Sequence, residues 1–208
     1  MCAGNTIRMD FAFHIYNKHC SDGATLALEK LLFHNAQIRK NVKKEGACTD
    51  ITEKSPVIVC IGSDLAIGDS LGPIVGSMLK YKTQGLGVFI YGTLTAPVTA
   101  KEIKYVRTFL KETHPDRQII AVDAAIGAEG DIGLLRLTDS PLYPGAGANK
   151  KLGAVGDVSV MGIVAEKSVA NYGLLNNTRL NLVYTMSEKL SDALASLLWN
   201  RQTNTQAN

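Results

Sequence analysis

The stretch "VIVCIGSDLAIGDSLGP" (residues 57–73) decides the predicted fold. Its first six residues form a short β-branched apolar run, which is typical of a strand buried on both faces of a parallel sheet. A loop rich in small residues follows, and Pro73 suits the first turn of a helix that begins near Ser70. The stretch therefore predicts a strand, a loop and a helix, which together form the opening unit of an α/β fold.

The same alternation continues along the chain. Residues 87–92 and 118–124 are two more apolar runs, and a helix is expected between them because Thr99 and Glu102 have the spacing of a capping box. Residues 131–139 add another expected strand. This order predicts right-handed crossovers and an α/β fold of three layers, with a mainly parallel sheet flanked by helices.

The two ends of the chain differ from this central pattern. Residues 1–50 are interpreted as an N-terminal helical extension and linker, with apolar residues at helical spacing over residues 25–44. Residues 51–202 are expected to form the α/β domain, which ends in an amphipathic helix near residues 178–199. Residues 203–208 are expected to form a polar tail.

Composition narrows the class of protein. The 208 residues are 46% hydrophobic, which suffices for one domain with a substantial core, and the net charge of +3 gives no reason to expect a nucleic-acid partner. No segment reaches the ~18 apolar residues of a membrane span, and the N-terminus lacks a signal-peptide pattern. We therefore expect a cytoplasmic protein without a membrane partner. Assembly into a homo-oligomer is left open.

The motif G-D-S-L-G at residues 68–72 fits the pattern of a serine nucleophile elbow. Such an elbow needs a histidine base late in the chain, but the last histidine is His114, which is interpreted as a solvated residue at the end of a helix. We therefore interpret Ser70 as a helix N-cap and favour Asp69 as the group that does chemistry. On this motif alone, a purely capping role for Asp69 stays open.

A second carboxylate favours the chemical role. Asp123 ends the apolar run of residues 118–124, and a carboxylate there is costly to bury unless it points into a site at the carboxyl edge of the sheet. Two carboxylates at that edge would repel each other, which raises one pKa and gives one acid and one base. Asp69 and Asp123 are therefore the predicted catalytic pair, with Asp64 as a further candidate.

Three ordered segments resemble a known family. The segments "CIGSDLAIGDSLGP", "IIAVDAAIG" and "PGAGANKKL" resemble the spore protein YyaC family, which is related to the germination protease that degrades small acid-soluble spore proteins. The first two are more distantly similar to hydrogenase maturation endopeptidases. The resemblance covers roughly residues 57–201 and implies a phosphorylase/hydrolase-like fold. It also implies a cytoplasmic location in the sporulating cell or spore.

The resemblance also implies roles for individual residues. The germination protease is similar in placing its two catalytic aspartates at the positions that Asp69 and Asp123 match. Its P-G-S-G-type loop is matched by residues 144–150, where backbone amides could bind a carbonyl or oxyanion, although a plain surface connection fits equally well. Supporting or substrate-binding roles are expected for Asp64, Ser70, Gly145, Gly147, Asn149 and Lys150.

Three functions remain open on these grounds. The favoured one is an aspartate-dependent peptidase that acts on a peptide or protein substrate without a cofactor. The alternatives are a non-catalytic spore protein that uses the fold for partner binding, and a maturation-type endopeptidase. The maturation enzymes add a later histidine to the two acidic positions to bind nickel. No histidine follows Asp123 here, so no metal site is expected.

Overall fold

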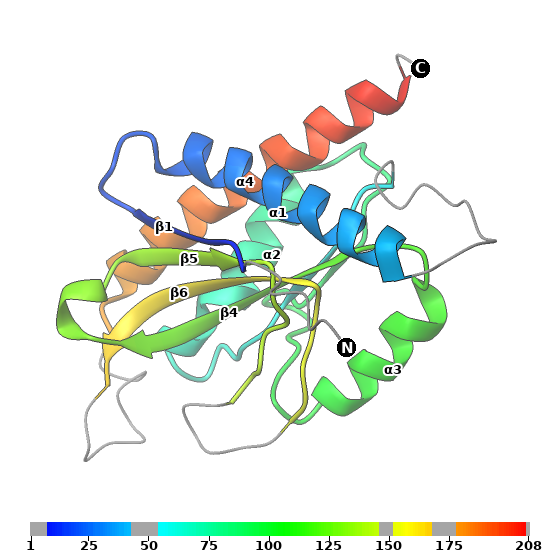
Figure 1. Cartoon of the computed structure of the whole chain (residues 1–208). Coiled ribbons are helices and arrows are strands. Elements are labelled where there is room, and N and C mark those ends of the chain that lie inside the picture. Colours follow the sequence, from blue (N-terminus) through cyan, green and yellow to red (C-terminus); the bar gives the residue numbers. More distant parts are fainter. Residues whose placement is uncertain (1–7, 43–53, 146–151, 168–177, 207–208) are drawn as a thin grey trace, which may run out of the picture.

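The computed structural model describes residues 8–42, 54–145, 152–167 and 178–206 (Figure 1). Its strands form one sheet in the order β1-β5-β6-β4-β2-β3. In chain order these strands are β1 (Asp10–His14), β2 (Val57–Cys60), β3 (Ile90–Tyr91), β4 (Ile119–Gly127), β5 (Leu134–Thr138) and β6 (Val158–Glu166). The helices are α1 (Cys20–Val42), α2 (Leu71–Lys82), α3 (Ile103–Thr113) and α4 (Leu180–Gln206), with short 3₁₀ turns η1 (Gly68–Ser70) and η2 (Glu129–Asp131).

The sheet is mixed, with a parallel centre. β3, β2, β4 and β6 run parallel to one another, whereas β5 is antiparallel to both β6 and β1. β5 reverses direction because only the short turn η2 separates it from β4, and such a connection is too short for a crossover. The predicted mainly parallel sheet is therefore confirmed, with an antiparallel pair of strands at one side.

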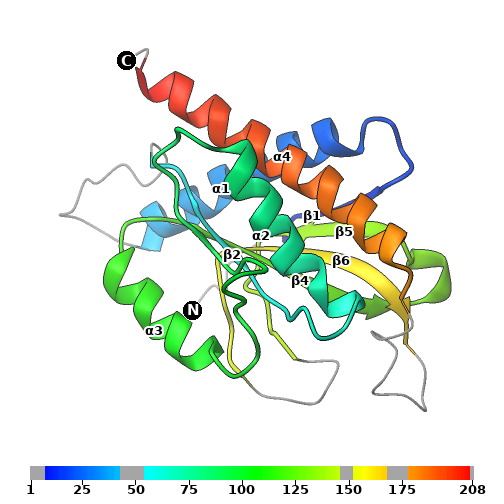
Figure 2. The same cartoon turned by 180° about the vertical axis from the view of Figure 1, so that it is seen from behind.

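Helices cover both faces of the sheet, which confirms the three layers. α1, α2 and α4 pack on one face and α3 lies on the other (Figures 1 and 2). The larger core cluster lies under the first three helices and includes Leu28, Leu31, Val75, Ile120, Val160 and Leu194. The smaller cluster lies under α3 and includes Val57, Val59, Ile103 and Leu110. None of the described helices combines the length and apolar character that a membrane crossing requires.

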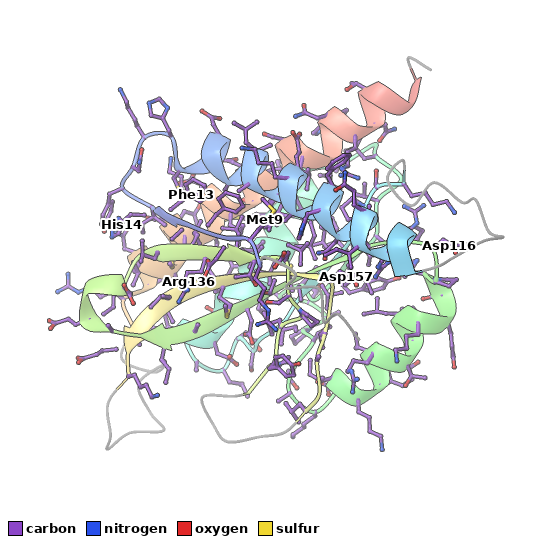
Figure 3. The ribbon with its side chains drawn as sticks, in the orientation of Figure 1. Met9, Phe13, His14, Asp116, Arg136 and Asp157 are labelled. Carbon is purple, nitrogen blue, oxygen red and sulfur yellow. The ribbon has the colours of Figure 1, made fainter. Side chains whose placement is uncertain are left out.

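Two strands were not predicted. β6 follows the Gly- and Pro-rich loop directly and is almost entirely buried, and β1 is a half-exposed strand within the expected helical extension. Phe13 of β1 packs on α1, where a Cβ added to Gly23 would lie 2.6 Å from the Phe13 ring (Figure 3). α1 in turn shares the larger core cluster, so the described part of residues 1–50 packs on the sheet instead of standing apart from it. The division of the chain into domains stays a prediction.

Candidate active site

The connections of the sheet diverge between β2 and β4. The chain leaves β2 through η1 and α2 toward β3 on one side, and it leaves β4 through η2 toward β5 on the other. Open α/β sheets bind their ligands at the carboxyl ends of strands at such a switch point. Asp69 follows β2 and Asp123 lies in β4, so the two predicted catalytic residues flank this point.

Asp123 lies one residue beyond the end of the pairing between β4 and β2. Cys60 pairs with Val122, and the N–H of Ile61 donates to the carbonyl of Val122 at 2.7 Å before the β2 chain turns away. On its other side, Asp123 pairs with Met161 of β6. The Asp123 side chain is half-buried in this position, at the place where the sheet opens.

The backbone of Asp69 is held against the end of β2. The N–H of Ser63 donates to the Asp69 carbonyl at 3.1 Å, and a Cβ added to Gly62 would lie 2.1 Å from the same oxygen. Gly62 also has a φ of +143°, so a side chain there is excluded both by conformation and by space. The glycine after the strand is therefore what lets Asp69 lie beside the sheet.

The loop after β3 closes the same edge, and the sequence analysis did not include it in the site. Ile61 forms an isolated bridge with Val98, and the N–H of Gly62 donates to the Val98 carbonyl at 3.0 Å. A signal was present in the sequence, because the loop after any strand of a parallel sheet begins at the carboxyl edge.

The two carboxyl groups share one electrostatic environment. Burial, and then the charge of Asp69, raise the pKa of Asp123 well above its ordinary value of 3.8. The N–H of Ala124 donates to Asp123 Oδ1 at 2.8 Å and opposes this shift, because it favours the charged form. Asp123 therefore keeps its proton to a higher pH than an ordinary carboxyl group does.

Ser70 occupies the predicted N-cap position of α2 but does not cap it. Its hydroxyl donates to the Ile67 carbonyl at 2.6 Å and makes no bond to a free helix N–H. A capping side chain needs an extended backbone, whereas η1 gives Ser70 a helical φ of −79° and ψ of −3°. The prediction that Ser70 lies at the N-cap position is confirmed, and the prediction that its side chain caps the helix is wrong.

The remaining predicted residues lie in loops or outside the described chain. Asp64 is exposed in the loop that precedes η1. Gly145 lies in a turn with a φ of +72°, in a loop whose stem is the bridge between Leu142 and Val155. Gly147, Asn149 and Lys150 lie outside the described residues.

His114 is buried, although the sequence analysis expected it to be solvated. It occupies the C-cap position of α3, its Nε2 lies 2.8 Å from the Tyr91 hydroxyl, and its ring packs on Phe89. Burial, with the Arg117 charge, lowers the pKa of His114. In the described part of the chain, no hydrogen bond joins a histidine to Ser70, and the aspartate interpretation therefore retains its advantage over a serine nucleophile.

The donor set at this edge does not fit a nickel site. Across residues 8–42, 54–145, 152–167 and 178–206, no group of three or more His, Cys, Asp or Glu side chains is arranged to hold a metal ion. Asp69 and Asp123 supply two carboxylates without the histidine that the maturation enzymes add. No step of the proposed chemistry is therefore assigned to a metal.

Comparison with known proteins identifies the family. The family described as "Protein of unknown function (DUF1256)" matches residues 33–193, which include both Asp69 and Asp123. The chain belongs to the DUF1256 family. A protein of this kind from Bacillus subtilis (strain 168), with the name "Uncharacterized protein YyaC", is 43% identical over 142 residues, which are 68% of this chain and 69% of that protein.

The DUF1256 region begins within α1 and ends within α4, so it contains part of each of these helices and the sheet from β2 to β6. Among solved structures, the crystal structure of a NiFe hydrogenase maturation protease HycI from Thermococcus kodakarensis KOD1 has a TM-score of 0.44 and 20% sequence identity. That match covers 71% of this chain and 94% of the other.

Proposed function

We propose that this DUF1256 protein is an aspartate-dependent peptidase in which Asp69 and Asp123 form the catalytic pair. The observation that supports the proposal is the coupling of the two carboxyl groups at the switch point, where burial and the Asp69 charge raise the pKa of Asp123. Pairs of titratable groups whose pKa values are pushed apart serve as acid and base in many hydrolytic sites.

The two aspartates take different roles in this proposal. Ionised Asp69 accepts a proton from a water molecule whose oxygen adds to the scissile carbonyl carbon. Asp123 donates its proton to the amide nitrogen, the carbon–nitrogen bond breaks, and the products are a carboxylic acid and an amine. One proton then passes from Asp69 back to Asp123, which restores the starting state.

The substrate class follows from the resemblance of the residues around the pair. The segments that contain Asp69 and Asp123 are similar to those of the germination protease, so the proposed substrate is a protein or peptide of the sporulating cell or spore. A partner-binding protein without catalysis, or a maturation-type endopeptidase, would share the fold, and the experiment below separates the three.

The test is cleavage by the full-length protein. The chain is kept whole because α1 lies in the larger core cluster, and removal of the first ~50 residues would take that helix out of the core. The wild type, Asp69→Asn and Asp123→Asn are incubated with small spore proteins and a mixed peptide library. Each substitution should lower the cleavage rate by about 10²–10⁴-fold, because either the base or the acid is lost.

Glu112→Gln is the matched control, because Glu112 is an exposed carboxylate of α3 and belongs to neither the predicted pair nor its supporting residues. It should cleave at close to the wild-type rate. Cleavage that survives Asp69→Asn or Asp123→Asn contradicts the mechanism. Loss of cleavage in chelator, with recovery in nickel, favours the maturation-type endopeptidase. If the wild type cleaves no substrate, the hypothesis of a non-catalytic, partner-binding protein is favoured.

A further inference from the structure

A basic pocket lies at the opposite end of β4 from Asp123. Its volume is about 310 Å³, and it is bounded by the C-terminal half of α3, the end of α1 and the chain that leads into β6. Its lining includes Ile119, the first residue of β4, and the apolar side chains of Leu110, Pro115 and Val155. The pocket is therefore distinct from the edge of the sheet that carries Asp69 and Asp123.

Three cations on its wall have no carboxylate partner among the described residues. Arg107 and Lys111 come from α3, and Arg117 follows the helix. Among the described residues, no ion pair with a nitrogen–oxygen distance within 4.0 Å includes Arg107, Lys111 or Arg117. Arg117 contacts neutral groups instead, since it donates to the Ser55 carbonyl at 2.7 Å and lies 5.1 Å from the centre of the Phe89 ring.

The one carboxylate among the described residues that line the pocket is already paired. Arg39 of α1 pairs with Asp157 Oδ1, and the N–H of Ile119 donates to Asp157 Oδ2 at 2.8 Å. Figure 3 shows Asp157 beneath the C-terminal part of α1, on the side of α3. The charges of Arg39 and Asp157 therefore cancel, and the described residues that line the pocket keep an excess of three positive charges.

The dipole of α3 explains only part of this excess. A cation in the last turn of a helix stabilises it, which accounts for Lys111. Arg107 lies four residues earlier on the same side of the helix, and like charges at this spacing destabilise a helix. Arg107 is also held at the pocket, because its guanidinium lies 2.3 Å from where a Cβ on Gly153 would be.

We propose that this pocket binds a small phosphorylated molecule, a phosphomonoester with a compact apolar body. Guanidinium groups form paired, charge-assisted hydrogen bonds with phosphate oxygens, and Lys111 adds a third positive charge. The apolar floor would cover the body of the ligand. The volume lies near the lower end of the roughly 300–1,000 Å³ that small-molecule pockets span, so the ligand is small. This proposal does not depend on peptidase activity.

The test is calorimetric titration of the full-length protein with phenyl phosphate, inorganic phosphate and benzoate. Phenyl phosphate should bind saturably and at least about tenfold more tightly than either of the others, because only it has both the dianion and the apolar body. The double substitution Arg107→Gln/Lys111→Gln should abolish this binding. Lys101→Gln/Lys104→Gln removes the same charge from exposed positions at the start of α3 and should leave it unchanged.

The outcomes distinguish specific binding in this pocket from a general attraction of anions to the positively charged protein. Absence of saturable phenyl phosphate binding to the wild type would overturn the proposal. So would equal losses in the two double variants, since that would reflect only the net charge of the protein. Inorganic phosphate or benzoate that binds as tightly as phenyl phosphate would overturn the assignment of a phosphorylated organic ligand.

Discussion

Burial and the charge of Asp69, which follows β2, together raise the pKa of Asp123 in β4. The turn η1 holds Asp69 beside the end of β2, because its backbone contacts Gly62 and Ser63. Asp123 lies in β4 just beyond the last residue that pairs with β2. A carboxyl group with a raised pKa contributes to stability in a way that depends on pH, which makes the arrangement measurable without a substrate.

We expect Asp123→Asn to raise the free energy of unfolding at pH 7. The pKa of Asp123 is higher in the folded state than in the unfolded one, so the wild type loses stability as pH rises above about 3.8 and through the folded pKa. The amide avoids this loss and can still accept from the Ala124 N–H. Each unit of pKa elevation corresponds to about 1.4 kcal/mol. Urea unfolding of the wild type and the variant measures the difference between their free energies of unfolding. This difference should grow from pH 3.5 to pH 7, a range of about 3.5 units.

Asp64→Asn is the control for that experiment, because the Asp64 side chain is exposed. Its effect on the free energy of unfolding should be small. A gain from Asp123→Asn that does not shrink toward low pH would show that the wild-type carboxyl group has no raised pKa.

We expect Asp69→Asn to lower the pKa of Asp123. The substitution removes the negative charge that opposes ionisation of Asp123, while the larger effect of burial remains. The Asp123 pKa should therefore fall but stay above its ordinary value. Titration of the Asp123 carboxyl carbon by NMR, in the wild type and in the variant, measures the change. An unchanged pKa would mean that the two groups do not interact.

The central unit of the fold was predictable because its signals are local. The apolar run before Gly62 became β2, Pro73 lies in the first turn of α2, and Glu102 accepts from the Thr99 N–H at 3.0 Å, although α3 begins only at Ile103, with Glu102 and not Thr99 at its N-cap. β1 was not predictable in this way, because its place beside β5 is fixed by pairing between residues that are far apart in the chain.

The positions of the two aspartates were predictable in the same way, because Asp69 follows β2 and Asp123 lies in β4. Their role as a catalytic pair stays a prediction. The basic pocket had no local signal, because Arg107 and Arg117 face it together only when α3 ends beside the start of β4. The burial of His114 likewise depends on Tyr91 from another strand.

We expect Ser70→Ala to cost only about 1 kcal/mol of unfolding free energy. The variant loses the hydrogen bond from the Ser70 hydroxyl to the Ile67 carbonyl, but that carbonyl still accepts from the Ser70 N–H at 3.2 Å. Ser187→Ala is a suitable comparison, because the buried Ser187 hydroxyl also donates to a backbone carbonyl, that of Val183, at 2.8 Å. Thermal and urea unfolding of both variants measure the costs.

Ser70 should also stay unlabelled by a fluorophosphonate probe, because no histidine of the described chain forms a hydrogen bond to it. Mass spectrometry of the treated protein detects the label. Stoichiometric modification of Ser70 would favour a serine hydrolase over the aspartate-dependent peptidase and would contradict the role of Asp69 as the base.

We expect Gly92→Ala to destabilise the protein much more than Gly85→Ala. Both glycines have similar positive φ values, +85° and +87°, so both substitutions carry the same conformational cost of about 1–3 kcal/mol. A Cβ on Gly92 would lie 1.7 Å from the Cys60 carbonyl oxygen, whereas one on Gly85 would meet no atom within 4 Å. The difference between the two free energies of unfolding therefore isolates the close approach of the β3 loop to the end of β2.

Because Gly92→Ala must displace the backbone beside Ile61, it should also change the pKa of Asp123, and Gly85→Ala should not. Equal losses in the two variants would mean that this loop is not packed against β2 and does not support the position of the aspartate pair.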